Sequence, residues 1–154
     1  MHDAHHVLRF PGGAVSYAPA RALDRRSYPS GGSGLVGTGD DYLTFIEALR
    51  LDDRRLLDAT AFAAMKRDQL GHARGPAPEL GDGWGFGFGL GVLLDAARAN
   101  SLLSPGSFRW EGAYGNAFWV DPSERLSVVL LSNTAIEGMF GQLPADLRSA
   151  VYQR

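Results

Sequence analysis

Large side chains and glycines alternate over residues 84–91, and this pattern constrains the fold more than any other feature of the sequence. Single glycines separate Trp84, Phe86, Phe88 and Leu90. A period of two places successive side chains on opposite faces of a β-strand, so one face is aromatic and the other is bare. Glycines inside a strand mark the close approach of another backbone or of a ligand. The sequence therefore predicts a sheet strand against which something packs closely.

Two further stretches have the period of a strand. One runs over residues 107–120 and is broken near Gly115, and the other runs over 126–132. The segments between the predicted strands are short, which favours antiparallel pairing because a parallel pair needs a long crossover. The sequence predicts three antiparallel strands in this part of the chain.

Helical periodicity precedes and follows these strands. Apolar residues at i, i+3, i+4 and i+7 predict a helix over residues 39–50. A second helix is expected to begin at an Asp58 cap and to end before Gly71, and a third opens at Pro144. The order of helix, helix, three strands and helix indicates the α+β class, with an antiparallel sheet flanked by helices.

The length of 154 residues corresponds to one domain. Residues 1–37 show little periodicity and are predicted to be an irregular lead-in segment, whereas residues 38–154 hold every predicted element as a single incomplete domain. Nearly forty residues without an element are unusual in a compact domain. We therefore expect the lead-in to pack as extended loop or against a part that this sequence does not contain.

Charge and composition exclude several classes of function. Fifteen basic and seventeen acidic residues give a net charge of −2, so nothing favours nucleic acid or an anionic membrane as partner. No cysteine is present, which excludes disulfides, thiolate metal sites and thiol nucleophiles. The longest strongly apolar run, residues 128–131, is far below the about 20 residues of a membrane span. Without signal-peptide features at its start, the chain is predicted to be cytoplasmic.

Histidines and an aspartate lie close together at the start of the sequence, as His2, Asp3, His5 and His6. They lack the HExxH-type spacing of a metal site, so we interpret them as a solvated terminal segment. His72 stands alone and is expected to be a surface residue. The sequence predicts no metal.

Two motifs of cofactor binding and catalysis are incomplete. The glycines of residues 81–91 do not spell GxGxxG, because Val92 stands where the last glycine would be. Residues 31–34 resemble the GxSxG nucleophile elbow, but Leu35 replaces its final glycine. The sequence therefore predicts no phosphate site and no cofactor.

The segment WEGAYGNAFWVDP, residues 110–122, is the most informative part of the chain. On its own it indicates an aromatic-rich hairpin. Together with PSGGSGLVGT at 29–38, GWGFG at 83–87 and the strand at 126–133 before a terminal helix, it resembles the C-terminal part of the β-lactamase-related serine hydrolases. These include class C β-lactamases, penicillin-binding proteins and esterases. The resemblance runs from about residue 28 to the C-terminus and implies the C-terminal part of a β-lactamase/transpeptidase-like fold.

Members of this family acylate a serine in an SxxK motif, whose lysine helps to deprotonate the hydroxyl. Lys66 is the only lysine of this chain, and Ala63 occupies the position where the serine would stand. The family also uses a Tyr-x-Asn or Ser-x-Asn element before its strand triad. Residues 114–116 spell Tyr-x-Asn but follow the triad, so we interpret them as a turn. A nucleophile would have to come from another polypeptide or from sequence absent here.

The resemblance also implies a wall for the substrate. The family's strand triad is Lys-Thr-Gly or a variant such as Trp-x-Gly, and Trp110, Glu111 and Gly112 fit the esterase-like variant. This variant lacks the cation that binds a β-lactam carboxylate, and Glu111 is expected to oppose such an anion. Ala113 takes the position whose backbone N–H donates to the oxyanion.

Three functions stay open at this point. The first is the C-terminal portion of an esterase-like serine hydrolase, inactive alone, which would act on a small-molecule ester or amide if an N-terminal part completed it. The second is a non-catalytic ligand- or partner-binding module derived from that fold, with the aromatic residues around Trp84 as its surface. The third is a shortened gene product without a selected function. An unpaired sheet edge is also expected, through which the chain would self-associate.

Overall fold

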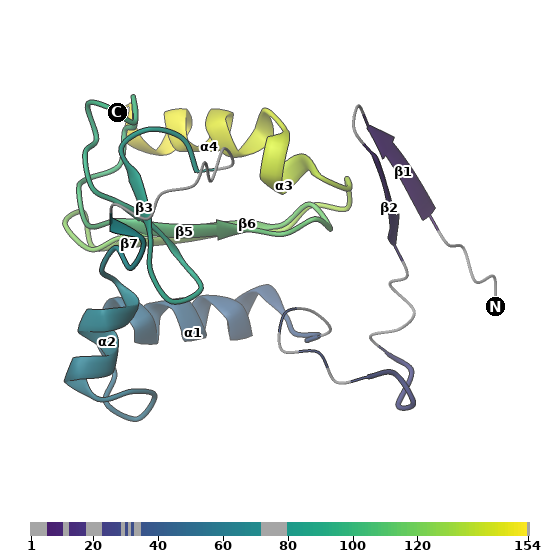
Figure 1. Cartoon of the computed structure of the whole chain (residues 1–154), viewed down its shortest axis with the longest axis horizontal. Helices are drawn as coiled ribbons and strands as arrows, with labels where there is room; N and C mark the ends of the chain where they lie inside the picture. Colours follow the sequence, from purple (N-terminus) through teal and green to yellow (C-terminus); the bar gives the residue numbers. More distant parts are fainter. Residues whose placement is uncertain are drawn as a thin grey trace. The chain divides into compact units, whose positions relative to one another are not determined.

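The computed structural model describes residues 6–10, 13–17, 23–28, 30, 32, 35–71 and 80–153. The chain divides into two compact units, Met1–Thr38 and Gly39–Arg154, and each is described by itself (Figure 1).

The first unit contains a β-hairpin. Strand β1 (His6–Phe10) pairs with β2 (Gly13–Tyr17) in antiparallel register. The prediction of an irregular lead-in is wrong for these ten residues. Polar and apolar residues do not alternate in HVLRF or in GAVSY, and pairing of the two strands stabilises what the local pattern leaves undecided.

The second unit is built on a five-stranded antiparallel sheet in which every strand pairs with the next along the chain. The strands are β3 (Trp84–Phe86), β4 (Gly91–Leu93), β5 (Phe108–Glu111), β6 (Ala117–Asp121) and β7 (Leu126–Leu130). The antiparallel pairing expected from the short connections is confirmed.

The segment with alternating glycines forms a hairpin instead of the single strand that its period predicted. The chain reverses where the Gly87 N–H donates a hydrogen bond to the Leu90 carbonyl, at 2.8 Å. Gly89 has a φ of 78°, which glycine adopts without the steric penalty of other residues. A period of two continues through the tight turn, so the pattern could not show where the strand ends.

Helices cover both faces of the sheet (Figure 1). On one face lie α1 (Gly39–Arg50) and α2 (Ala59–Met65), and on the other lie α3 (Glu137–Phe140) and α4 (Leu143–Tyr152). Helix α2 begins at its predicted cap, because the Asp58 side chain accepts a hydrogen bond from the Ala61 N–H at 2.8 Å. The short helix α3 was not predicted. Within the described residues, no helix is long and apolar enough to cross a membrane.

Gly85 in β3 and Gly87 just after it are explained by the end of α2 and the chain that follows it. A Cβ at Gly87 would lie 1.9 Å from the Met65 carbonyl oxygen, and one at Gly85 would lie 2.7 Å from Asp68 Cγ. The Asp68 carboxylate also accepts a hydrogen bond from the Phe86 N–H at 3.1 Å. The close approach that the sequence predicted is therefore made by protein, with no room left for a ligand at this point.

Each face of the sheet has its own buried cluster. The first face, under α1 and α2, buries Ile46, Leu49, Phe62, Leu90, Val92, Phe108, Phe118 and Val120. The second face, under α4, buries Leu80, Trp84, Leu93, Leu103 and Trp119, against which Leu147, Val151 and Tyr152 pack. Trp110 packs against both clusters.

Candidate functional site

The residues that the resemblance assigns to a substrate wall lie where β5 loses one of its two neighbours. Strand β4 pairs with β5 only as far as Arg109, whereas β6 pairs with it as far as Glu111. Trp110 and Glu111 thus have no strand partner on the β4 side among the described residues. An unpaired stretch of strand can bind an extended ligand through its backbone N–H and C=O groups.

A tight turn over residues 112–116 follows this stretch. The Gly112 N–H donates to the Asn116 carbonyl at 2.7 Å, and the Gly115 N–H donates to the Gly112 carbonyl at 3.0 Å. Gly115 has a φ of 101°, which favours glycine. The Tyr-x-Asn sequence at 114–116 therefore reverses the chain between β5 and β6, as its position after the triad predicted.

This turn orients the Ala113 N–H. The Gly112 carbonyl and the Ala113 N–H belong to one planar trans peptide group, in which they point in opposite directions. Because the carbonyl points into the turn toward Gly115, the Ala113 N–H points out of it. It has no hydrogen-bond acceptor within the part of the chain that the structure describes.

A cluster of charged side chains lies beside the wall. Arg109 Nη1 donates to Glu111 Oε1 at 2.7 Å, and the two side chains are only 15% and 13% exposed. The Arg109 guanidinium stacks on Trp84, 4.3 Å from the ring centroid, and Arg148 of α4 adds a second positive charge. Burial raises the pKa of Glu111, against the lowering effect of both arginines, and burial lowers the pKa of Arg148.

The expectation that Glu111 opposes an anionic substrate is wrong in its premise. It assumed an unpaired carboxylate, whereas Glu111 is buried against Arg109 and lies in the field of Arg148. Two cations and one anion leave this cluster with a net positive charge. Sequence reasoning missed Arg148 because only the packing of α4 on the sheet brings it near Glu111, whereas the place of Arg109 two residues before Glu111 in one strand was a signal it did not use.

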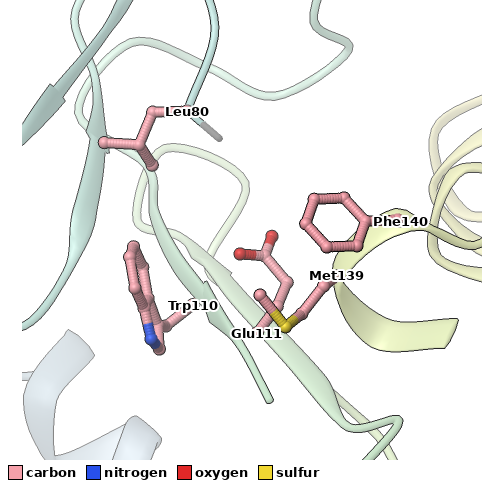
Figure 2. Close-up of a pocket in the computed structure, with 5 residues that line it drawn as sticks. All are labelled: Leu80, Trp110, Glu111, Met139 and Phe140. Carbon is pink, nitrogen blue, oxygen red and sulfur yellow. The ribbon is translucent and has the colours of Figure 1, made fainter. Parts of the chain in front are cut away.

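A small cavity borders the wall on the α3 side (Figure 2). Its volume is about 30 Å³, and it is lined by Leu80, Trp110, Glu111, Met139 and Phe140. In Figure 2 the Glu111 carboxylate lies between the Trp110 ring and the two side chains from α3. Phe86 holds the other side of Trp110 in an edge contact, with ring centroids 5.1 Å apart. A cavity of this size holds about one water molecule, so it is too small for an ester substrate.

The single lysine serves the fold on the first face. Lys66 Nζ donates to Asp52 Oδ1 and, at 3.3 Å, to the Leu49 carbonyl, and it lies over the rings of Phe62 and Phe108. It therefore joins the end of α2 to the end of α1. These contacts account for Lys66 without a role in proton transfer.

The remaining candidate residues are either part of the core or outside the described part of the chain. Trp84 and Trp119 are core residues, 8% and 0% exposed, so they do not form an open ligand surface. The candidate metal residues His2, Asp3 and His5 lie outside the described residues, as do the side chain of His6 and position 72.

The comparisons with known proteins identify the family. The profile of the Beta-lactamase family matches residues 3–153. The chain therefore belongs to the Beta-lactamase family, and the resemblance drawn from the motifs is confirmed.

Individual relatives place the chain among the esterase-like members. It is 46% identical to "Esterase EstB" of Burkholderia gladioli over 143 residues, 93% of this chain and 36% of that protein. It is 35% identical to "Protein Rv1367c" of Mycobacterium tuberculosis (strain ATCC 25618 / H37Rv) over 116 residues, 68% of this chain and 29% of that protein.

A solved structure agrees with these sequence relatives. The fold matches "EstCE1, a hydrolase with promiscuous acyltransferase activity" with a TM-score of 0.85 and 42% identity, over 96% of this chain and 39% of that one. The α+β fold of this family is thereby confirmed. The chain spans only a little over a third of the length of EstB and of EstCE1.

Proposed function

We propose that this chain supplies the substrate wall and one oxyanion donor of an esterase-like serine hydrolase. The observation that carries the proposal is the unpaired end of β5 at Trp110 and Glu111, followed by an Ala113 N–H that points out of its turn. The similarity to Esterase EstB supports an ester as substrate class. The serine nucleophile comes from the part of the fold that EstB and EstCE1 have and this chain does not match.

The chain's residues act on the substrate, not on the nucleophile. An extended ester lies along the free side of β5, where backbone N–H and C=O groups hold it in register. When the serine hydroxyl attacks the ester carbonyl, the carbonyl oxygen gains a negative charge and the alcohol later leaves. The Ala113 N–H donates a hydrogen bond to that oxygen, and one such donor is worth roughly 100- to 1,000-fold in rate.

The chain alone has no covalent turnover under this proposal. It lacks SxxK, and its only lysine is held by Asp52 and the Leu49 carbonyl. We expect a fluorophosphonate probe to leave every serine of the purified chain unlabelled. Labelling of one serine, abolished by a single Ser→Ala change, would contradict the proposal.

The proposed contribution of this chain to catalysis is tested by supplying the part of the fold that it does not match. The chain is mixed with a separate polypeptide that carries the part of EstB it does not match. We expect hydrolysis of nitrophenyl butyrate by the mixture and labelling of a serine on the EstB piece only. A Lys66→Met variant is the matched control, because Lys66 stabilises the first face and its loss leaves the chemistry unchanged. No turnover by a mixture that forms a stable complex would refute the proposal.

The alternative is a non-catalytic module that binds a ligand or a partner through the same wall. Calorimetry with a boronic acid or a short-chain ester separates it from the hydrolase, since it predicts binding without any gain of activity on completion. A penicillin-binding-protein-like character and a cytoplasmic location stay predictions.

The outer edge of β7 is a further candidate for contacts. Among the described residues β7 pairs only with β6, and its sequence LSVVL contains no charge and no proline that would protect an edge. We propose that the purified chain self-associates through this edge, so its sedimentation coefficient would rise with concentration. A sedimentation coefficient that does not change with concentration would contradict this proposal.

A further inference from the structure

We infer that residues 132–138 position the oxyanion donor, with Ile136 and Gly138 as the residues that fix the turn carrying Ala113. This inference rests on the proposed role of the Ala113 N–H. The segment runs from just after β7 into the first residues of α3 and contains no residue of the SxxK, Tyr-x-Asn or strand-triad motifs, so its role follows only from its contacts.

The segment holds the turn from both of its ends. The Ile136 N–H donates to the Ala113 carbonyl at 2.9 Å. At the other end, the Ser132 N–H donates to Asn116 Oδ1 at 3.4 Å. A Cβ on Gly115 would lie 2.3 Å from the Thr134 carbonyl oxygen, so the segment touches the turn backbone directly.

Ile136 adopts a backbone conformation that its side chain disfavours. Its φ is 68° and its ψ is −11°, in the left-handed region, where a β-branched residue is a genuine outlier. Such a conformation persists only where the surrounding structure determines it, and such residues cluster at functional sites. Here the left-handed residue presents its N–H to the Ala113 carbonyl and also begins α3.

Gly138 allows α3 to lie directly on the turn. A Cβ at this position would lie 2.1 Å from the Asn116 carbonyl oxygen and 2.9 Å from the Gly115 carbonyl carbon. Any side chain at position 138 therefore has to displace the turn or the helix. The same Asn116 carbonyl accepts the hydrogen bond from the Gly112 N–H, so a displacement of Asn116 would also move Gly112.

The direction of the Ala113 N–H depends on this arrangement. Gly112 is held at its N–H by Asn116 and at its carbonyl by Gly115, and the carbonyl shares a rigid peptide plane with the Ala113 N–H. Residues 132–138 hold Gly115 and Asn116 in place by direct contact. These two residues hold Gly112 by hydrogen bonds, and the peptide plane after Gly112 sets the direction of the Ala113 N–H. A donor stabilises the oxyanion only from about 2.7–3.1 Å, so a small rotation of this plane lowers the rate.

The test compares Gly138→Ala with Gly87→Ala. Both place a Cβ against a carbonyl oxygen, at 2.1 and 1.9 Å, but Gly87 meets Met65 far along the chain from the turn. On the chain alone, amide hydrogen exchange is read by NMR. We expect Gly138→Ala to accelerate exchange at Gly112 and Gly115 at least roughly tenfold more than the control does, since it opens the hydrogen bonds that protect them.

The second readout uses the hydrolase completed with the EstB piece. We expect Gly138→Ala to lower kcat by roughly tenfold or more with KM unchanged, which is part of the rate factor that one oxyanion donor supplies. Gly87→Ala should leave kcat unchanged at temperatures below the melting temperature of that variant. Equal kcat for both variants would overturn the positioning role.

The remaining outcomes are also decisive. If the completed protein shows no turnover at all, the proposed function fails, and hydrogen exchange alone decides whether residues 132–138 hold the turn. Should Gly138→Ala not fold, Asn116→Ala replaces it, because it removes only the side-chain acceptor of the Ser132 N–H. Asn116→Ala is expected to accelerate hydrogen exchange at Gly112 and Gly115, by a smaller factor than Gly138→Ala. Unchanged exchange at Gly112 would overturn the inference.

Discussion

The two faces of the sheet in the second unit are stabilised in different ways. The first face, under α1 and α2, is filled by apolar side chains, with the Lys66 ammonium over the rings of Phe62 and Phe108 and the Glu47–Arg50 pair beside them. The second face, under α4, buries Arg109, Glu111 and Asp121 among its apolar residues. Burial of apolar area requires only the right size and shape, whereas a buried charge requires a partner.

The second face meets this requirement with hydrogen bonds to its buried carboxylates. The Asp121 carboxylate is fully buried and accepts from the N–H groups of Ser104, Ser123 and Glu124 and from the Tyr152 hydroxyl. One side chain thus joins the loop before β5, the turn after β6 and the end of α4. The difference teaches that the face next to the candidate site is the one that depends on specific polar contacts.

The largest effect is expected on the apolar face. Phe108 has no exposed surface and lies in the middle of the first cluster. Phe108→Ala should lower the free energy of unfolding by about 4 kcal/mol, because it leaves a cavity that the sheet cannot close. Urea unfolding measures the loss. The matched control Phe88→Ala, at a position 60% exposed, should change it by less than about 0.5 kcal/mol.

The next effect distinguishes the faces. Arg109→Met leaves Glu111 buried without its main partner and should destabilise the fold by about 3 kcal/mol. A second change, Glu111→Leu, should restore part of this loss, since an apolar pair needs no partner. The loss should also shrink as the pH falls toward 4.5, because burial raises the pKa of Glu111 and the neutral acid is the better tolerated form. A double variant no more stable than Arg109→Met would contradict the comparison.

Tyr152→Phe tests the hydrogen bond that joins α4 to Asp121. The hydroxyl donates to Asp121 Oδ2 at 3.3 Å, and its loss should lower the free energy of unfolding by about 1 kcal/mol. Burial raises the pKa of Tyr152 to about 12, above its ordinary value of 10.0. The native state therefore holds this proton longer than the unfolded state, and its contribution is lost as the pH rises through about 12. Denaturant unfolding at a series of alkaline pH values should show that slope in the native chain and not in Tyr152→Phe.

The smallest effect is expected at the rim of the first face. Glu47 and Arg50 form a pair with 2.7 Å between Oε2 and Nη2, three residues apart on α1. Hydrogen bonds from Arg50 lower the pKa of Glu47 to about 2, so the contribution is present above pH 4.5 and lost as the pH falls through about 2. Because the Glu47 side chain is partly exposed, Glu47→Gln should cost less than about 1 kcal/mol at pH 7. The two proteins should converge in stability near pH 2, and a gap that stays constant would exclude this pair as its source.

The elements with many residues or a strong local cue were predictable. Helix α1 has the predicted bounds, the Asp58 cap is formed, and the break near Gly115 is the turn between β5 and β6. The hairpin at Gly87 and Gly89 was not predictable from the sequence, because large side chains and glycines keep alternating where the chain turns. Strands β1 and β2 show no alternation of polar and apolar residues, and helix α3, with four residues, is too short for its periodicity to be visible.

The candidate site was predictable only along the wall strand. Trp110 to Ala113 were predicted as the wall because their spacing matches a motif of the family, and residues 114–116 were predicted as a turn because they follow that motif. Arg148, Ile136 and Gly138 carry no local pattern, since their contacts are with residues more than twenty positions away along the chain.

Residue types and their order determined the α+β class, the family and the lack of an SxxK motif in this chain, and they pointed to the candidate wall residues. These properties are local, because each depends on residues a few positions apart. Packing alone decided that Arg148 lies near Glu111, that Gly85 and Gly87 meet the end of α2 and the chain after it, and that residues 132–138 lie on the turn of Ala113. Charges and carbonyl groups act over a few ångströms in space, and only the folded chain brings those groups within that distance.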